Sequence, residues 1–176
     1  AGEVWSFQQQ IASAKYFSSS GGSLSSDDDI WTYPDTGQGD SYMTARLETE
    51  PPTLCALSSE AAFVDFILHP EADTYLEASD PWFRWQVTLS MTTIRSNISE
   101  LFARRMAADP KRFTLLSSDG TVKADDILQV EVTERAASGV LQQIKLTGWD
   151  QELTVSGEYN NRCILAPSAE ENITLQ

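Results

Sequence analysis

The sequence predicts an α+β fold: a single domain of mainly antiparallel strands, covered on one face by two or three helices. Three observations lead to this prediction. A chain of 176 residues is long enough to bury a sizeable core as one domain. Apolar residues recur at helical spacing from Ile94 to Met106, which predicts an amphipathic helix. Apolar and polar residues alternate from Leu128 to Thr133, which predicts a strand with one buried face.

The N-terminal segment is predicted to contain two short strands, Val4 to Phe7 and Ile11 to Phe17, because both are rich in apolar and aromatic residues. A Ser- and Gly-rich stretch follows from Ser18 to Ser26, here called the Ser/Gly loop. The acidic run Asp27 to Asp29 lacks the alternate spacing of an EF-hand calcium loop. We therefore expect a solvated turn there.

The middle of the chain alternates between loops and short elements. Residues 33–40 are rich in Pro and Gly and predict a loop, and a strand is expected from Ser41 to Glu48. Ser58 and Ser59 precede a predicted helix from Glu60 to Leu68, which Pro70 ends. His69 lies at that helix end, so we interpret it as a terminal cap rather than a catalytic base.

Residues 71–80 are expected to be irregular, and Trp82 to Leu89 alternates as a strand does. The helix at Ile94 to Met106 is expected to be capped by Ser90 or Thr92 and to end at Asp109-Pro110.

Beyond this helix the chain is predicted to be rich in strands. Phe113 to Leu116 is expected to enter a hairpin at Asp119-Gly120. After the strand around Leu128 to Thr133, a turn at Ser138-Gly139 leads to Val140 to Thr147, and the strands continue at Leu153 and Val155. Ser156 is expected to cap a short helix that contains Tyr159 and Arg162, and Ile173 to Leu175 to add an edge strand.

Composition excludes several classes of function. The net charge is −14, with only 12 Lys and Arg, so binding to nucleic acids or to anionic membranes is not expected. No apolar run approaches the roughly 20 residues that span a bilayer. No signal peptide begins the chain, although an exported protein has the same appearance after its signal is removed.

The chain offers few ligands for a metal ion. Cys55 and Cys163 are equally compatible with two buried thiols and with a disulfide formed in an oxidising compartment. With these two cysteines and the single His69, the four nitrogen or sulfur ligands of a structural zinc site are not available. We expect no metal and no cofactor.

The Ser/Gly loop has the chemistry of a binding site for a hydroxyl-rich ligand such as a sugar. Gly21 and Gly22 can adopt positive φ and allow a ligand close to the backbone, and the neighbouring serine hydroxyls donate and accept hydrogen bonds. Trp31 offers an indole face on which a sugar ring can stack. The alternative is an ordinary surface loop, since Ser and Gly are common in turns.

The order of these residues resembles the SpoIID/LytB domain family, which comprises bacterial cell-wall proteins related to a sporulation protein and an amidase enhancer. Tyr16-x-Ser18-x-Ser20-Gly21-Gly22 followed by Asp29-Ile30-Trp31 is similar to one block of that family. A second block is similar to segments further along the chain: Trp85 to Leu89, Leu128 to Arg135, Ser138-Gly139-Val140, Ile144 to Gly148, Val155-Ser156-Gly157 and Arg162.

The resemblance implies an extracytoplasmic protein that binds or cleaves peptidoglycan glycan strands, as lytic transglycosylases do, with a cell-wall amidase as a further partner. The substrate-binding residues are then expected to be Tyr16, Ser18, Ser19, Ser20, Gly21, Gly22 and Trp31.

The chain departs from the family pattern in several places. The family has Thr and Arg where Leu24 and Val140 stand here, and residues 35–80 match poorly and resemble an insertion. The family's catalytic glutamate precedes an Ala-rich helix that this sequence lacks. The chain, residues 1–176, therefore resembles either the C-terminal part of such a domain or a single SpoIID-like domain without its catalytic element, and its catalytic residues are unknown. The alternative function is a non-catalytic amidase enhancer or a secreted interaction module.

No residue of the chain stands out as a general acid. Asp65 lies within the predicted helix but is expected to point outward, and Glu134 is expected to pair with Arg135 at the surface. Of the tryptophans, Trp85 and Trp149 lie in predicted strands and are expected in the core, whereas Trp31 is expected at the binding site.

Overall fold

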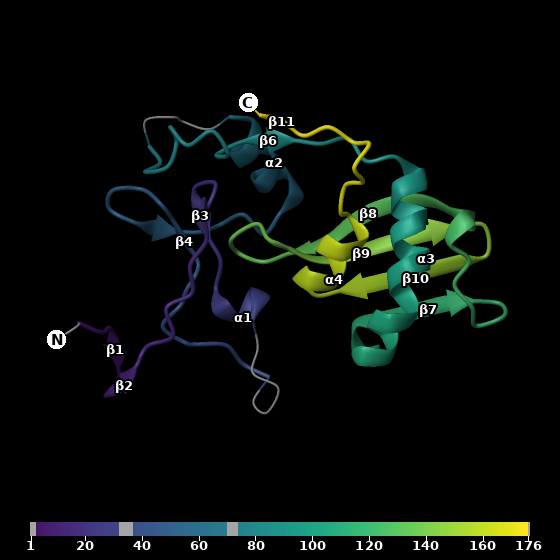
Figure 1. Cartoon of the computed structure of the whole chain (residues 1–176), viewed down its shortest axis with the longest axis horizontal. Helices are drawn as coiled ribbons and strands as arrows, with labels where there is room; N and C mark the ends of the chain where they lie inside the picture. The colour runs from purple at the N-terminus through teal and green to yellow at the C-terminus, as the bar shows by residue number, and fades with distance from the viewer. Residues whose placement is uncertain (1–2, 32–36, 70–73, 176) are drawn as a thin grey trace.

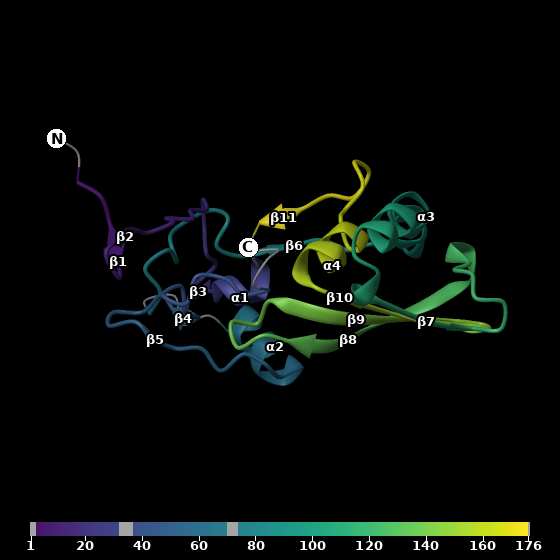
Figure 2. The same cartoon turned by 90° about the horizontal axis from the view of Figure 1, so that it is seen from below.

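The computed structural model describes residues 3–31, 37–69 and 74–175, and confirms the α+β fold (Figure 1). Its largest unit is an antiparallel sheet in the order β7-β10-β9-β8. The four strands are β7 (Phe113–Ser117), β8 (Ile127–Arg135), β9 (Leu141–Gly148) and β10 (Gln151–Ser156). Two helices, α3 (Met91–Ala108) and α4 (Glu158–Ile164), lie on the same face of this sheet (Figure 2).

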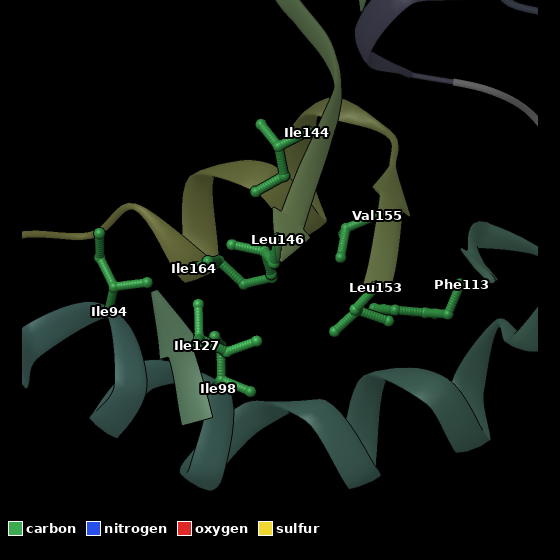
Figure 3. Packing of buried hydrophobic residues seen from close by; sticks show 9 residues of the cluster. All are labelled: Ile94, Ile98, Phe113, Ile127, Ile144, Leu146, Leu153, Val155 and Ile164. Carbon is green, nitrogen blue, oxygen red and sulfur yellow. The ribbon is translucent and has the colours of Figure 1, made fainter. Parts of the chain in front are cut away.

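The core lies between these two helices and the sheet (Figure 3). Ile144 and Leu146 of β9 stand opposite Val155 and Leu153 of β10, and all four side chains are fully buried. The remaining buried members come from α3, α4 and the two edge strands: Ile94, Ile98, Phe113, Ile127 and Ile164. The alternation of apolar residues in the sequence therefore marks the face of the sheet that the helices cover.

Helix α3 begins where the sequence predicts, at the Ser90 cap. The Ser90 hydroxyl accepts a hydrogen bond from the Thr93 N–H, and Thr93, Ile94 and Ile98 are buried. The Glu171 carboxylate also accepts from the Ser90 N–H at 2.6 Å, at the positive end of the helix dipole. These bonds attach the C-terminal segment that follows α4 to the start of α3.

The hairpin predicted at Asp119-Gly120 does not form. Gly120 adopts a positive φ of 71°, but β7 pairs with β10, and β8 lies at the opposite edge of the sheet. The intervening segment crosses the end of the sheet and contains the short 3₁₀ helix η2 (Ala124–Asp126). Gln151 holds it there, because its side-chain amide exchanges two hydrogen bonds with the Lys123 backbone.

The N-terminal part, which comprises residues 3–31, 37–69 and 74–86, contains short elements. A two-stranded ribbon is formed by β1 (Ser6–Phe7) and β2 (Gln10–Ile11). A three-stranded sheet consists of β3 (Ser23–Leu24), β4 (Arg46–Leu47) and β5 (Thr53–Leu54). The helices are α1 (Asp27–Ile30) and α2 (Glu60–Leu68), which Ser59 caps. A further ribbon pairs β6 (Trp85–Gln86) with the C-terminal β11 (Thr174–Leu175).

The strands predicted at Ile11 to Phe17, Ser41 to Glu48 and Trp82 to Leu89 were too long. Strand structure is confined to Gln10–Ile11, Arg46–Leu47 and Trp85–Gln86, respectively. Apolar side chains along the first of these stretches are exposed, and Tyr16 is 95% exposed. These aromatic residues therefore have β propensity without a core surface to pack on.

Smaller expectations have mixed outcomes. The N-cap of α4 is Gly157, at a φ of 91°, rather than Ser156. Helix α3 ends at Ala108 with Asp109 as its C-cap, as predicted, and a 3₁₀ helix, η1 (Pro110–Arg112), follows it. The loop expected at residues 33–40, the helix end at Pro70 and the irregular stretch at 71–80 fall partly on positions outside the described residues.

The turn between β8 and β9 joins the two parts of the molecule. In Figure 1 this turn projects from the sheet toward β3 and α2. The Leu57 N–H donates to the Ala137 carbonyl at 2.8 Å, and Phe63 of α2 packs against Gly139. The residues expected to bind ligand are thus brought next to a segment more than a hundred positions away in the sequence.

Candidate functional site

The Ser/Gly loop makes its sharp turn at the glycine pair. Gly21 and Gly22 have φ angles of 64° and 90°, a region that side-chain-bearing residues rarely adopt. A Cβ atom on Gly22 would also lie 2.9 Å from the Tyr75 ring. The second glycine is therefore required by packing against the protein itself as well as by backbone conformation.

Two glutamates fix the serines of this loop. Glu77 Oε2 accepts hydrogen bonds from the Ser20 N–H at 2.6 Å, from the Ser20 hydroxyl at 2.9 Å and from the Ser19 hydroxyl at 3.2 Å. The Ser20 hydroxyl also contacts the Glu48 carboxylate and accepts from the Gly22 N–H. Hydroxyl groups that the sequence offers to a ligand are thus engaged with carboxylates of the chain.

Arg84 supports the loop from the other side. Its guanidinium donates to the Gly21 carbonyl at 2.6 Å and to the Phe83 carbonyl at 2.9 Å. It also donates to the Phe66 and Ile67 carbonyls in the last turn of α2, and it stacks on the rings of Phe66 and Phe83. Burial lowers the pKa of this guanidinium, although the electrostatic interaction with the phenolic oxygen of Tyr75 opposes the shift. Arg84 thus connects the loop to the C-terminus of a helix.

The turn between β8 and β9 approaches the same loop. The Ser23 hydroxyl donates to the Ser138 carbonyl at 2.9 Å, and the hydroxyls of Ser25 and Ser138 lie 3.0 Å apart. Gly139 has a φ of 87°, and a Cβ atom there would lie 2.4 Å from the Phe63 ring. Small residues at this turn allow close contact between the two parts.

These contacts enclose a pocket of about 550 Å³, here called the arginine pocket. Its polar wall comes from Arg84, Arg135 and serines of the loop and the turn, and the three residues of α2 that share one face, Phe63, Phe66 and Ile67, form an apolar wall. The indoles of Trp82 and Trp85 complete the lining, and both remain more than half exposed. Such a combination of apolar walls and a few placed polar groups is typical of small-ligand sites.

A second pocket, of about 610 Å³, lies on the other side of the Ser/Gly loop and is here called the Trp31 pocket. Its lining includes the apolar side chains of Phe17, Leu24, Ile30 and Trp31 together with Arg46 and Glu48. Ser19, Ser20, Ser23 and Ser25 line both pockets. The loop therefore forms a wall between them.

Asp27 anchors the Trp31 pocket and corrects the expectation of a solvated acidic turn. Only 4% of this residue is exposed, and its carboxylate contacts Lys15 Nζ at 2.5 Å and accepts from the Asp40 N–H at 2.7 Å. Burial disfavours the Lys15 charge, but the bonds to Asp27 and Asp40 outweigh it and raise the pKa of this ammonium. The acidic run forms helix α1 instead of an open turn.

The structure separates the predicted site residues into groups. Ser19 and Ser20 line both pockets, Gly21 lines the arginine pocket and Trp31 the other. Tyr16, Ser18 and Gly22 are not among the described residues that line either pocket. Gly22 is buried against Tyr75, whereas the Tyr16 ring is almost fully exposed.

The expected burial of Trp85 and Trp149 and the expected pairing of Glu134 with Arg135 were both wrong. Trp85 and Trp149 are 53% and 80% exposed rather than in the core, because the strand at Trp85 is short and Trp149 lies in the tight turn between β9 and β10. Arg135 pairs with Glu60 of α2, with its Nε 2.5 Å from the carboxylate, instead of with Glu134.

Four further residues contribute to the site and were not predicted from the sequence as site residues: Arg84, Glu48, Glu77 and Ser138. A charged residue between Phe83 and Trp85, in a stretch expected to be buried, was a usable signal for Arg84. The two glutamates carry no local signal, because their role depends on contacts with a loop 28 and 57 positions away.

Other chemistry near the pockets is limited. Cys55 is a free thiol whose pKa is raised by burial, with its sulfur 3.4 Å from the Ser23 hydroxyl, and Cys163 is also free. Asp65 is exposed, as predicted, and bonds to His69, which is the C-cap residue of α2. Within the described ranges, no three His, Cys, Asp or Glu side chains gather closely enough to hold a metal ion.

In the described part of the chain, no helix combines the length and the apolar character that crossing a bilayer requires.

Comparison with protein-family models, with curated proteins and with solved structures finds no match to this chain.

Proposed function

We propose that this chain is a glycan-binding domain of the bacterial cell wall, and that it binds peptidoglycan glycan strands at the arginine pocket. The observation that carries the proposal is the convergence of distant segments on that pocket. Several residues that line the arginine pocket belong to the blocks that resemble the SpoIID/LytB family: Ser20, Gly21, Trp85, Arg135, Ser138 and Gly139.

The composition of the pocket suits a sugar. Indole and phenyl faces stack on the apolar faces of pyranose rings, while hydroxyl groups and backbone N–H groups bond to the ring hydroxyls. Trp82 and Trp85 keep much of their surface exposed at the pocket, so they are accessible to a ligand. A ligand outside the cytoplasmic membrane implies an extracytoplasmic location, and a wall amidase is a further partner under this proposal.

Binding is favoured over cleavage by the contacts of the two carboxylates that bond to the Ser/Gly loop. General acid catalysis of glycoside cleavage needs a carboxyl group that reaches the glycosidic oxygen. Glu77 is held by three hydrogen bonds from Ser19 and Ser20, and Glu48 contacts Ser20. Both carboxylates therefore anchor the loop. A lytic transglycosylase with its acid in another segment is the second candidate function, favoured by the family resemblance.

Isothermal titration calorimetry with amidase-treated glycan strands tests the proposal. We expect Trp85→Ala to weaken binding by about fivefold, because a stacked aromatic contact contributes on the order of 1 kcal/mol. Trp149→Ala is the matched control, since this tryptophan is more exposed but lies in the turn between β9 and β10, at the other end of β9 from Ser138 and Gly139, and does not line the pocket. Equal affinity of both variants and the unmodified chain would overturn the assignment of the arginine pocket.

The same preparations test for cleavage. We expect no anhydro-muramyl products after prolonged incubation of the unmodified chain with glycan strands. Mass spectrometry of the soluble fraction provides the measurement. Formation of these products would show that an acid within residues 1–176 performs the chemistry, and Glu48→Gln would then identify whether that acid is Glu48.

A further inference from the structure

Arg84 carries a buried positive charge that is surrounded by backbone carbonyls, and it forms no ion pair with a carboxylate of the described residues. The residue is only 5% exposed, and it is the one Lys or Arg among the buried polar residues of the described ranges. Acidic residues outnumber basic ones by 26 to 12 in this sequence. Even so, the ion pairs within the described part of the chain do not include Arg84, whereas the neighbouring Arg135 pairs with Glu60.

The groups around Arg84 position its guanidinium more than they neutralise it. Four of its N–H groups donate to the backbone carbonyls of Gly21, Phe66, Ile67 and Phe83. Two of these carbonyls belong to the C-terminus of α2, and a helix C-terminus is equivalent to roughly half a negative charge. A guanidinium has five N–H donors, so one of those on Nη2 remains beyond these four bonds.

This charge lines the arginine pocket, beside hydroxyl groups and aromatic walls. Buried charges in proteins are usually paired, because an isolated one pays a large desolvation cost. An anionic group on a ligand would supply that pairing for Arg84. A planar carboxylate is the natural partner of a guanidinium that is held in a fixed orientation. The aromatic walls add a surface for a ring.

We propose that the arginine pocket contains a subsite for a sugar ring with a carboxylate substituent, and that Arg84 binds this carboxylate. The inference rests on the proposed function, because it assumes that the pocket accepts a sugar. It goes beyond that function by assigning the charge of the ligand and the residue that recognises it. The carboxylate can come from an ether-linked lactyl group, as in N-acetylmuramic acid, or from a hexuronic acid.

Matched ligands provide the first test. Calorimetric titration compares N-acetylmuramic acid oligosaccharides with their methylamides, galacturonic acid oligomers with their methylamides, and neutral N-acetylglucosamine oligomers. We expect at least one free acid to bind roughly tenfold to a hundredfold more tightly than its own amide, which is the contribution of a charge-assisted hydrogen bond. The pair that shows this preference identifies the source of the carboxylate.

Substitution then assigns the preference to Arg84. We expect Arg84→Met to bind acid and amide equally while retaining affinity for the neutral oligomer. Arg95→Met is the control, because Arg95 also donates to a backbone carbonyl, that of Ile127, and does not line the pocket. If Arg84→Met does not fold, NMR of the arginine side-chain nitrogens in the unmodified chain replaces it, and the Arg84 signals should shift with the acid alone.

The outcomes separate the two proposals. Equal binding of acid and amide by the unmodified chain, or a preference that survives in folded Arg84→Met, overturns the carboxylate subsite and leaves glycan binding intact. Unmoved Arg84 signals on titration with the acid have the same meaning. Failure of every oligosaccharide to bind, neutral ones included, overturns the proposed function itself.

Discussion

Single glycines and carboxylates determine how the two parts of the molecule meet. Gly139 shows this most clearly, because both its positive φ and the Phe63 ring exclude a side chain. We expect Gly139→Ala to lower the free energy of unfolding by about 2–4 kcal/mol, the sum of backbone strain and overpacking. Gly120→Ala separates the two causes, since Gly120 has a φ of 71° but open space around it, and its cost should be about 1 kcal/mol. Urea denaturation of both variants provides the comparison. Equal costs would mean that the contact with Phe63 does not constrain this turn.

A titrating residue also connects the C-terminal segment to α3. Hydrogen bonds from the Ser90 and Ser168 N–H groups lower the pKa of Glu171 from its usual 4.5 to about 2. A carboxyl group with a lower pKa in the folded state stabilises the fold above its unfolded pKa and loses that contribution as pH falls through its folded pKa. We expect Glu171→Gln to lower the melting temperature at pH 7, and this difference to vanish between about pH 4.5 and 2. The exposed neighbour Glu170, changed to Gln, serves as the control. A difference independent of pH would contradict the role of the ionised carboxylate.

Among the elements, α3 provides the strongest link between sequence and stability. Ile98 is 1% exposed and packs in the core, whereas Leu101 on the same helix is half-buried and outside the core cluster. We expect Ile98→Ala to cost about 2–5 kcal/mol of unfolding free energy and Leu101→Ala distinctly less. Thermal and urea denaturation measure both. A larger cost at Leu101 would indicate that the helix is rotated about its axis.

The same contrast explains which elements could be predicted from the sequence. Periodicity identified α3, β8, β9 and β10 because these elements pack against one common core, which imposes the 3.6- and 2-residue repeats. It failed for Ile11 to Phe17 and Trp82 to Leu89, where most aromatic side chains are more than half exposed: Tyr16, Phe17, Trp82 and Trp85. The Asp119-Gly120 turn was located correctly, but a dipeptide cannot specify that β7 pairs with β10 instead of β8.

The candidate site shows the same limit. The Ser/Gly loop and its positive-φ glycines could be recognised locally, since chemistry and backbone conformation are properties of the stretch itself. Three features depend on segments that only the folded chain brings together: the division of the loop's residues between two pockets, the anchoring by Glu48 and Glu77, and the bond from Arg84 to the loop. Hydrogen-bonding partners at such separations leave no periodic pattern in a single sequence.

At the scale of the whole molecule, the overall charge opposes the local one at Arg84. A net charge of −14 repels an anionic glycan strand at long range, while the guanidinium attracts its carboxylate at contact distance. Added salt screens charges that are separated by more than about 10 Å at 0.1 M, and it affects a buried contact far less. We therefore expect the affinity for an acidic glycan strand to rise when NaCl is increased from about 10 mM to about 150 mM, because repulsion weakens more than attraction. Calorimetric titration at both salt concentrations measures this, with a neutral N-acetylglucosamine oligomer as the control whose affinity stays constant. A fall in affinity for the acidic strand would mean that the local positive charge, and not the net charge, governs the approach of the ligand.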